Sequence, residues 1–572
     1  MIARRQIRRV VILTGMLAIS GLTHAQAPPD NVVSDAVGNT AMGTYALQNN
    51  TSGTNSTAAG SHTLASNTIG AYNTATGNSA LAYNQSGTSN SAVGYAALLY
   101  NVGGSRNSAF GFEALFDNTV DGNTAFGYVA LSANTTGTSN TAVGTQSLQN
   151  NGIGYGNSAL GYQALSQNVT GYNNTAVGAS ALLSSTGTDN TAVGANALYT
   201  NTNGTENTAV GSQALYLNLT GGSNTAIGFQ ALRDNTIGIW NTAVGNSAMG
   251  NNIGGQSNTA VGFFAMSDNT GGANNTAIGT YSLALNDNGN ANTAVGNLAL
   301  SSNVSGENNT AFGYNALTSN SSGKGNAAQG VNALYSNTTG IRNLGIGNNA
   351  LYSSNGSYNV ALGFEAGYNV TTGSNNIEIG AQGSASDNNT IQIGSQGTQT
   401  STKIAGIYGT QLTGSAVYVT SAGQLGVLAS SERYKTDISP IGSVTERLQL
   451  LRPVSFHLKA DPHGAVQYGL IAEEVAKVYP ELVIRDGKGR IEGVHYEELA
   501  PMLLGEIQKQ QRINVVQAAT IDAQARQIAA LSARADDADS RAAEIRDLKR
   551  LVAGMQAGLL ELQAKQELVA QR

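Results

Sequence analysis

The chain has 572 residues, a formal net charge of -6 and no cysteine. The slightly acidic balance does not favour a nucleic-acid partner, and without cysteine neither a disulfide framework nor a thiolate metal site can form. Glycine is frequent, with 71 residues, and charged residues make up only 11%, so the chain does not have the composition of a charge-extended disordered protein.

Residues 1–25 have the pattern of a signal peptide. Four arginines in residues 1–9 precede an apolar run at 10–22 that is short for a membrane span, although a membrane anchor is the alternative. We expect cleavage after Ala25, because a cut after Ala27 would place proline beside the scissile bond. No later apolar run is long enough to span a bilayer, so no transmembrane anchor is apparent. The mature chain is expected to be exported, to the cell surface or into the medium.

Residues 26–394 contain a repeated phrase, Asn-Thr/Ser-Ala-apolar-Gly. Its closing glycine recurs from Gly43 to Gly394, and of the 21 gaps between these glycines seventeen are 17 residues, three are 16 and the last is 14. A constant period over this length is typical of a solenoid. We therefore predict a mainly β protein, with a parallel β-roll or solenoid of about 17-residue coils as its largest part.

The full repeat is Asn-Thr-Ala-Val-Gly-x-x-Ala-Leu-x-x-Asn-x-Thr-Gly-x-x. It predicts two short strands per coil, separated by turns at Asn and Gly. Stacked coils are expected to place Val over Val and Leu over Leu in a thin, continuous core. Because Ala and Val are adjacent in the first strand, both strand faces are apolar, and one of them needs cover that a second chain could supply.

The five-residue phrase resembles the head repeats of trimeric autotransporter adhesins. The resemblance implies a left-handed parallel β-roll that forms trimers. The period here is longer than that of the family, except at the last step of 14 residues to Gly394. We therefore predict the β-roll itself, without an exact register.

The repeat array shows no pattern of catalytic residues. Acidic residues such as Asp117 and Glu206 do not recur in one column, whereas a glycosidase needs two carboxyl groups at one place. The many Asn-x-Thr/Ser matches are interpreted as turn chemistry. Stacked Thr columns are interpreted as a hydrated surface, with a flat ligand- or ice-binding face as the alternative.

The repeat ends in a predicted β neck, residues 395–429, followed by a small α+β domain, residues 430–502. The neck contains a predicted hairpin at 416–428. The small domain alternates short strand patterns with helical ones, and its second predicted hairpin spans 482–494.

Ser430 and Lys435 lie five residues apart at the start of the small domain. A serine hydroxyl becomes a nucleophile when a base takes its proton, and an uncharged lysine amine can be that base. The pair alone also fits an ordinary polar linker. Residues five apart on a regular helix diverge by about 140°, so the segment must bend or the two groups must meet between chains. His457, His463 and His495 are not at a metal-ligand spacing, and we expect no metal and no cofactor.

An ordered set of segments is more specific than this pair. It resembles the intramolecular chaperone domain of endosialidase-type phage tail spikes and fibres. The segments that carry the resemblance are 430–435, 450–456, 468–475, 480–483 and 496–504. The resemblance implies a homotrimer, help in folding the preceding β-rich fibre, and self-cleavage between Ala429 and Ser430. Ser430 would then be the nucleophile and Lys435 the base, and Ser431, one residue out of register, is the second candidate nucleophile.

Residues 503–572 contain no proline and predict a long helix. One heptad seam includes Ile521 and Ile528, and a second, out of phase with the first, runs from Ile545 to Leu562. We interpret the region as a coiled coil with a stutter. The alternative is an amphipathic helix folded back on its own domain.

The sequence thus predicts an exported, homotrimeric, fibrous protein whose C-terminal part drives assembly. Its enzymatic activity would be at most one self-cleavage by a Ser/Lys endopeptidase. One alternative is an adhesin whose rod binds a surface glycan or protein, and a further one is a polysaccharide-degrading enzyme. No nucleic-acid partner is expected.

Overall fold

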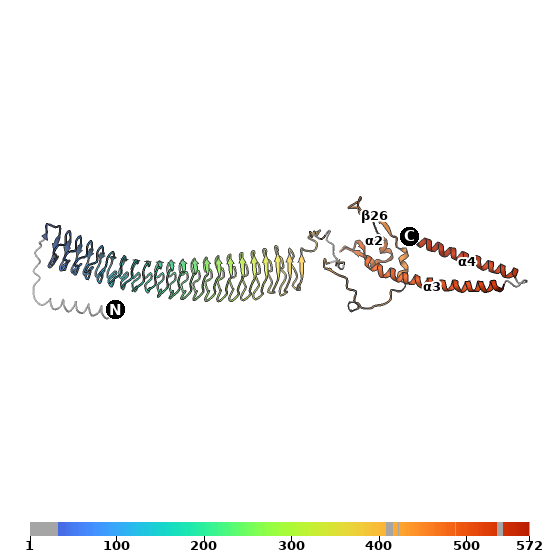
Figure 1. The fold of residues 1–572 in the computed structure, drawn as a ribbon, viewed down its shortest axis with the longest axis horizontal. Coiled ribbons are helices and arrows are strands. Elements are labelled where there is room, and N and C mark those ends of the chain that lie inside the picture. The colour runs from blue at the N-terminus through green and yellow to red at the C-terminus, as the bar shows by residue number, and fades with distance from the viewer. Residues whose placement is uncertain are drawn as a thin grey trace. The chain divides into compact units, whose positions relative to one another are not determined.

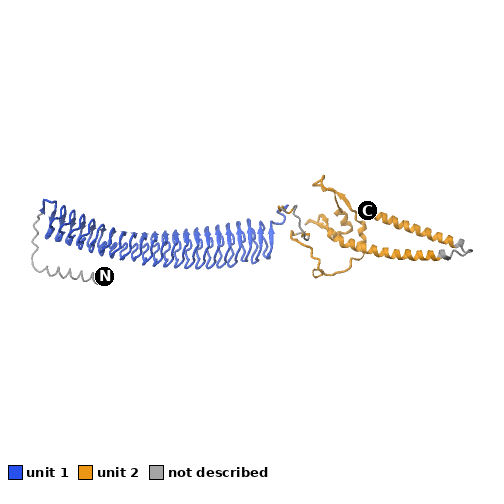
Figure 2. Cartoon of the chain, in the orientation of Figure 1, with its two compact units in different colours: residues 1–401 blue, residues 402–572 orange. Residues whose placement is uncertain are grey.

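A computed structural model of the chain describes residues 33–405, 407, 416–420, 422–486, 488–534 and 541–570. The chain divides into two units, residues 1–401 and 402–572 (Figure 2). The predicted signal peptide at 1–25 lies outside the described residues.

The first unit is a parallel β-solenoid (Figure 1). Each coil contributes one three-residue strand, and successive strands pair in parallel, as Thr208 pairs with Thr225 and Ala209 with Ala226. This confirms the predicted solenoid and its period. A short strand, β1 (Val33–Ser34), pairs antiparallel with the first of these strands. The strands are β2 Thr40–Met42, β3 Thr57–Ala59, β4 Thr74–Thr76, β5 Ser91–Val93, β6 Ser108–Phe110, β7 Thr124–Phe126, β8 Thr141–Val143, β9 Ser158–Leu160, β10 Thr175–Val177, β11 Thr191–Val193, β12 Thr208–Val210, β13 Thr225–Ile227, β14 Thr242–Val244, β15 Thr259–Val261, β16 Thr276–Ile278, β17 Thr293–Val295, β18 Thr310–Phe312, β19 Ala327–Gln329, β20 Leu344–Ile346, β21 Val360–Leu362, β22 Ile377–Ile379 and β23 Ile391–Ile393.

The core of the solenoid is built from alanine and leucine. The middle residue of each strand points inward, so that Ala226 is completely buried, whereas the third residue, Ile227, points outward and is exposed. The expectation that Val stacks over Val in the core was therefore wrong. In most coils the thin interior also holds asparagine side chains, which leaves room for alanine but not for a larger strand residue.

The second apolar segment of each coil is a series of turns, so the prediction of a second strand was wrong. In one coil Gln213 and Leu215 have φ values of 58° and 51°, on either side of Ala214. This left-handed conformation costs a non-glycine residue about 1 kcal/mol or more, and complete burial of the leucine side chain, worth about 1.5–3 kcal/mol, offsets it. The Leu215 N–H donates to the Ala231 carbonyl of the next coil at 3.0 Å.

Two columns of buried asparagines tie neighbouring coils together. In the first column the Asn224 backbone N–H donates to Asn207 Oδ1 at 3.0 Å, and Asn224 Nδ2 donates to the Gly238 carbonyl at 2.9 Å. In the second column Asn218 Nδ2 donates to Asn201 Oδ1 at 2.6 Å. Both columns thus satisfy buried backbone and side-chain groups of neighbouring coils.

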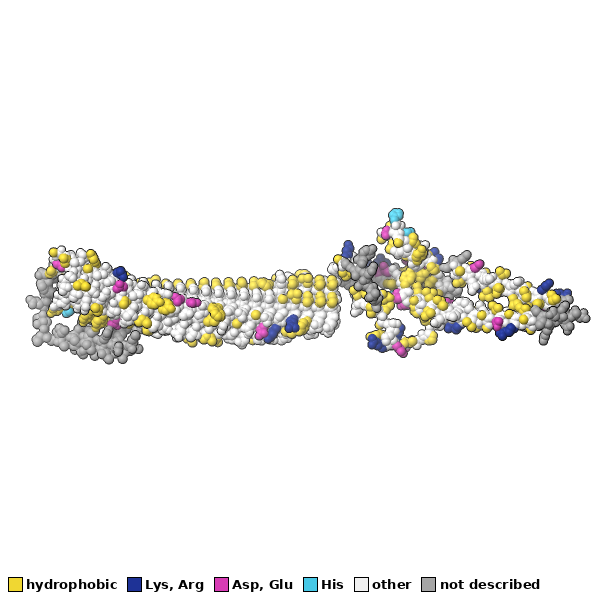
Figure 3. All heavy atoms as spheres, viewed as in Figure 1, with side chains coloured by type: hydrophobic (Ala, Val, Ile, Leu, Met, Phe, Trp, Pro, Cys, Tyr) yellow, Lys and Arg dark blue, Asp and Glu magenta, His cyan; other side chains and the backbone are white. Residues whose placement is uncertain are grey.

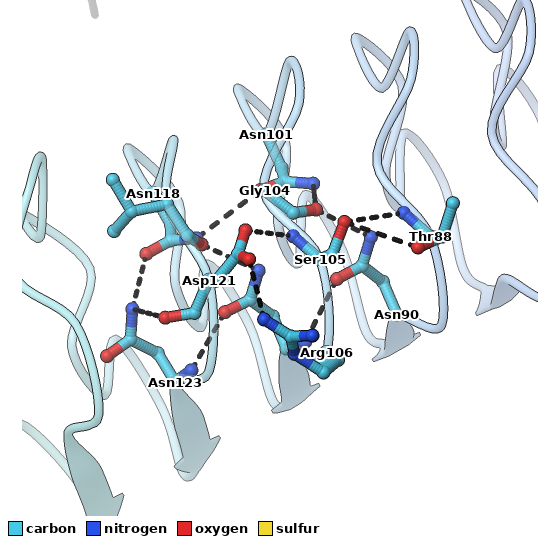
Figure 4. Close-up of polar contacts among 11 residues, drawn as sticks. Thr88, Asn90, Asn101, Gly104, Ser105, Arg106, Asn118, Asp121 and Asn123 are labelled. Carbon is cyan, nitrogen blue, oxygen red and sulfur yellow. Dashed lines mark hydrogen bonds and ion pairs between the residues drawn. The ribbon is translucent and has the colours of Figure 1, made fainter.

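The asparagine columns continue through a coil of only 16 residues (Figure 4). There Asn123 Nδ2 donates to Asn118 Oδ1 at 3.0 Å. At the nearby corner Asp121 accepts hydrogen bonds from the Ser105 N–H at 2.8 Å and from Arg106 at 2.9 Å. The missing residue is therefore accommodated without breaking the column.

The closing glycine of the repeat has no substitute in this fold. Gly60 has a φ of +134°, which is strained for any other residue, and a Cβ there would lie 2.7 Å from the Gly77 carbonyl oxygen. The same close approach recurs from coil to coil as far as Gly347, which explains why glycine marks the period there.

The second unit is a small α+β domain followed by two helices, and it contains both predicted hairpins. Its elements are β24 Tyr418–Val419, β25 Leu425–Gly426, η1 Glu432–Tyr434, η2 Gly442–Leu450, β26 Val454–Phe456, β27 Gln467–Gly469, α2 Ala472–Val478, η3 Pro480–Leu482, β28 Val483–Arg485, β29 Ile491–Val494, α3 Tyr496–Arg534 and α4 Arg541–Ala570. Its core packs Val475, Tyr479, Leu482, Val494 and Met502.

The expected uninterrupted helix is two helices, α3 and α4, that run side by side (Figure 1). Ile521 and Ile528 of α3 and Met555 and Leu559 of α4 line one groove. The two out-of-phase seams therefore belong to different helices of one chain. A coiled coil between chains stays a prediction. Of the helices in the described part, none combines the length and hydropathy needed to cross a bilayer.

Candidate functional site

The segment between Ser430 and Lys435 bends back on itself through a single 3₁₀ turn, Glu432–Tyr434. The residues before and after this turn are extended, and the Lys435 N–H donates to the Glu432 carbonyl at 3.0 Å. As a result Lys435 Nζ lies 3.5 Å from Ser430 Oγ. The two groups thus meet within one chain, through the bend that their spacing required.

The Ser/Lys pair is exposed to solvent in the single chain. A separation of 3.5 Å is the outer limit of a hydrogen bond, so the groups are adjacent without being tightly engaged. Ser431 occupies the position before the turn and its carbonyl accepts the Tyr434 N–H at 3.0 Å. Among the contacts of the described residues, it is the Ser430 hydroxyl that reaches Lys435.

A buried tyrosine holds the core of the small domain together. Tyr479 is completely buried, its hydroxyl donates to the Val444 carbonyl at 2.8 Å, and the Arg447 guanidinium lies 4.5 Å from the centre of its ring. Burial raises the pKa of the Tyr479 phenol. Thr445 Oγ1 also donates to Glu506 Oε2 at 2.8 Å, so η2 is bound both to Tyr479, the residue after α2, and to α3.

An ion pair links the connection between η2 and β26 to α2 at the surface. The Arg452 guanidinium contacts Glu474 through both carboxylate oxygens, at 2.6 and 3.2 Å. The hydrogen bonds from Arg452 lower the pKa of Glu474. Because the pair is exposed, it orients the two elements more than it stabilises them.

The three histidines of the small domain are not brought together as ligands. His457 Nδ1 contacts the Gly464 carbonyl at 3.1 Å, and His495 Nδ1 contacts Glu497 Oε1 at 2.9 Å. In the described part of the chain, no three His, Asp or Glu side chains form a group that could hold a metal ion.

One titratable residue, Glu378, was not singled out from the sequence. It is the middle residue of β22, is completely buried, and neither of its carboxylate oxygens has a hydrogen-bond partner among the described residues. Burial raises its pKa to about 7, and the nearby Asp387 charge adds to the effect. The available sequence signal was a carboxylic acid at a column position that alanine occupies in most other strands.

The fold and the site define a protein with a repetitive solenoid followed by a small α+β unit that carries a Ser/Lys pair at its start. A family model described as chaperone of endosialidase matches residues 430–484. The match begins at Ser430 and includes Lys435, which confirms the resemblance for this segment. No curated protein and no solved structure matches the chain.

Proposed function

We propose that the protein is an exported fibre whose residues 430–572 assemble it into a homotrimer, and that the chain then cuts itself between Ala429 and Ser430. One observation carries this proposal. The family match and the bend that brings Lys435 Nζ to Ser430 Oγ fall on the same segment of the chain. Extracellular placement is supported by the family description and by the pattern of residues 1–25.

Exposed apolar surfaces support assembly. Strands β24 and β25 form an isolated hairpin in which Val419 and Leu425 are exposed, and a lone two-stranded hairpin is marginal in water. The outward face of the solenoid is also apolar along its third strand position. Association of three copies would cover such surfaces.

The proposed cut proceeds through an ester. Lys435 Nζ, in its uncharged form, takes the proton of Ser430 Oγ, and this oxygen attacks the carbonyl carbon of Ala429. The bond between that carbon and the Ser430 nitrogen breaks, the nitrogen receives the proton from Lys435, and Ala429 remains as an ester on Oγ. Water then hydrolyses the ester, which leaves a carboxyl group on Ala429 and restores the Ser430 hydroxyl.

Assembly would control this reaction. Lys435 is exposed in the single chain, and exclusion of water by neighbouring copies would favour the uncharged amine that the first step needs. The cut would therefore follow assembly and release the rod from the segment that assembled it.

The test is expression of the full chain with Ser430→Ala, Lys435→Ala or Ser431→Ala. We expect the wild type and Ser431→Ala to yield a C-terminal fragment that begins at Ser430, and the other two variants to remain intact. Cleavage that persists in Ser430→Ala would refute the nucleophile. Sedimentation equilibrium of the intact Ser430→Ala protein should give a trimer mass, and a monomer would refute the assembly role.

Binding of a surface ligand by the rod is a second candidate, favoured by one observation. Tyr155 and Tyr172 stack with ring centroids 4.8 Å apart at the surface of neighbouring coils, and Tyr155 is exposed. Aromatic faces of this kind can bind apolar sugar faces or protein side chains. A glycan-binding measurement on the intact protein, with Tyr155→Ala as the comparison, would detect the role, and absence of binding by the wild type would leave the rod structural.

A further inference from the structure

The outward face of the solenoid changes composition near its C-terminal end. From β2 to β18 the first residue of each strand is Thr or Ser, and the third is mostly apolar. From β20 to β23 both outward residues are apolar. These eight residues, here called the end patch, are Leu344, Ile346, Val360, Leu362, Ile377, Ile379, Ile391 and Ile393.

The end patch is open to solvent in the single chain. Leu362 is 48% exposed, and Ile391 and Ile393 are 68% and 71% exposed. Apolar side chains form a row along one edge of the rod and become denser near the C-terminal end of the solenoid (Figure 3). No outward residue of β2 to β23 is charged. A contiguous, uncharged apolar area of this kind marks an interaction surface.

We propose that the end patch is a homotypic interface that joins copies of this chain in register. The proposal rests on the trimer assembly proposed above. The two columns of the patch continue towards the N-terminus as uncharged Thr and Val columns with the same coil spacing. Only a surface with the same period, close to 4.8 Å between strands, can match such columns along their length, and another copy of the rod has that period.

The position of the end patch in the chain also supports another copy of this chain as its partner. Ile393 ends the last strand of the solenoid, and the segment that matches the chaperone family begins soon afterwards, at Ser430. If that segment gathers three copies, the end patches are the first parts of the rods that are brought to the same place. Apolar burial there would then precede pairing of the rest of the rod.

The end patch would also prevent slippage. The Thr and Val columns are nearly identical in every coil, so two copies could shift by one coil at little cost. The patch is different, because the preceding strand β19 carries Ala327 and Gln329 at its outward positions. A shift by one coil would place an apolar pair of one copy against Gln329 of another and leave an apolar pair uncovered. The correct register is therefore the one that buries all four pairs.

Single cysteines test the contact, because the chain has none of its own. Leu362→Cys in full-length Ser430→Ala protein should be linked between chains by a short bismaleimide. Asn369→Cys, an exposed position in the turn segment of the same coil, is the matched control and should give at least fivefold less product. Sedimentation equilibrium separates the two ideas: a monomer refutes the assembly role, whereas a trimer without preferential linkage at Leu362→Cys refutes the end patch alone.

Register is tested by giving the patch the composition of the upstream coils. The patch variant combines Leu344→Thr, Val360→Thr, Ile377→Thr and Ile391→Thr. The control replaces four upstream outward valines, with Val193→Thr, Val210→Thr, Val244→Thr and Val261→Thr. Chains with Val295→Cys are co-expressed with chains carrying Ile278→Cys, one coil earlier. The measured quantity is the ratio of linkage between the two different cysteine positions, which reports a shift by one coil, to linkage between two copies of the same position, which reports the correct register. This ratio should rise at least fivefold in the patch variant and not in the control. An equal ratio in both variants would overturn the register role.

Discussion

Glu378 pairs with Ala361 in the parallel register of β21 and β22, so one coil buries a carboxyl group where the previous coil buries a methyl group. The interior there is remodelled, because Gly367 stands where most other coils have a leucine and Val370 where most have an asparagine. The last complete coils therefore hold an unpartnered acid in an apolar space.

Stability of these last coils is expected to fall as pH rises from about 4.5 to about 7. The ordinary pKa of this carboxyl group is 4.5 and its pKa in the fold is about 7, so the folded state binds more protons in this range. The stability is fully present below pH 4.5 and is lost as pH rises through the folded pKa, by on the order of 3 kcal/mol. Hydrogen exchange of β22 and β23 amides, corrected for intrinsic pH effects, would measure the loss.

Glu378→Gln should abolish most of this pH dependence, since the amide does not titrate. Glu307→Gln is the control, because Glu307 is partly exposed and paired with Lys324 at 3.1 Å. A wild-type pH profile that survives Glu378→Gln would show that another group is responsible.

Removal of one asparagine from the first column should be costly. Asn224→Ala takes away the acceptor of the Asn241 N–H and the donor to the Gly238 carbonyl, both in the coil interior. The Asn241 N–H and the Gly238 carbonyl would each lose a hydrogen bond in the coil interior. We therefore expect a loss of about 2–4 kcal/mol in the free energy of unfolding measured with urea. Asn246→Ala, at an exposed position, should change it by less than about 0.5 kcal/mol. Similar effects of both variants would contradict the role of the column.

The closing glycine should not tolerate even a methyl group. Gly211 has a φ of +133°, and a Cβ there would collide with the Gly228 backbone. Gly211→Ala is expected to cost more than about 3 kcal/mol or to prevent folding. Gly250→Ala is the comparison, because the nearest atom to a Cβ at Gly250 is 3.4 Å away. Circular dichroism melting of both variants would decide, and equal melting would be evidence against the close approach.

Residues 430–572 are expected to be needed for folding the rod and not for keeping it folded. Stacking of near-identical coils depends on non-local contacts and is slow and prone to slipped pairing. Residues 26–429 expressed alone should therefore be less soluble than the same segment released from full-length Ser430→Ala protein by an inserted protease site. Equal solubility and equal melting temperature would exclude the chaperone role.

The period of the solenoid was predictable because its cause is steric and local. Gly60 is required by its positive φ and by the approach of the next coil, and such a requirement appears in the sequence as an unbroken column. The backbone of the second apolar segment was not predictable, because a pattern of Ala and Leu reports burial and carries no sign of a left-handed φ such as that of Leu215. The same limit applies to Val in the strand, whose outward direction depends on what else fills the interior.

The site was predictable in part. The spacing of Ser430 and Lys435 required a bend, and the structure supplies it as one 3₁₀ turn. The division into α3 and α4 was visible as a change of heptad phase, but a stutter and a reversal give the same pattern in a sequence. What decides between them is whether the two seams bury each other, which is a tertiary contact.

The path of the chain around the solenoid has a mechanical consequence. The polypeptide runs around the axis of the rod, so an axial pull is resisted mainly by hydrogen bonds between coils, such as that from Thr225 N–H to the Asn241 carbonyl at 2.8 Å. These bonds are loaded one coil at a time from an end. A coil of 17 residues that rises about 4.8 Å when folded would lengthen by about 50 Å when unravelled. A tethered rod would thus yield under load in equal steps, and absorb work while most of its length stays folded.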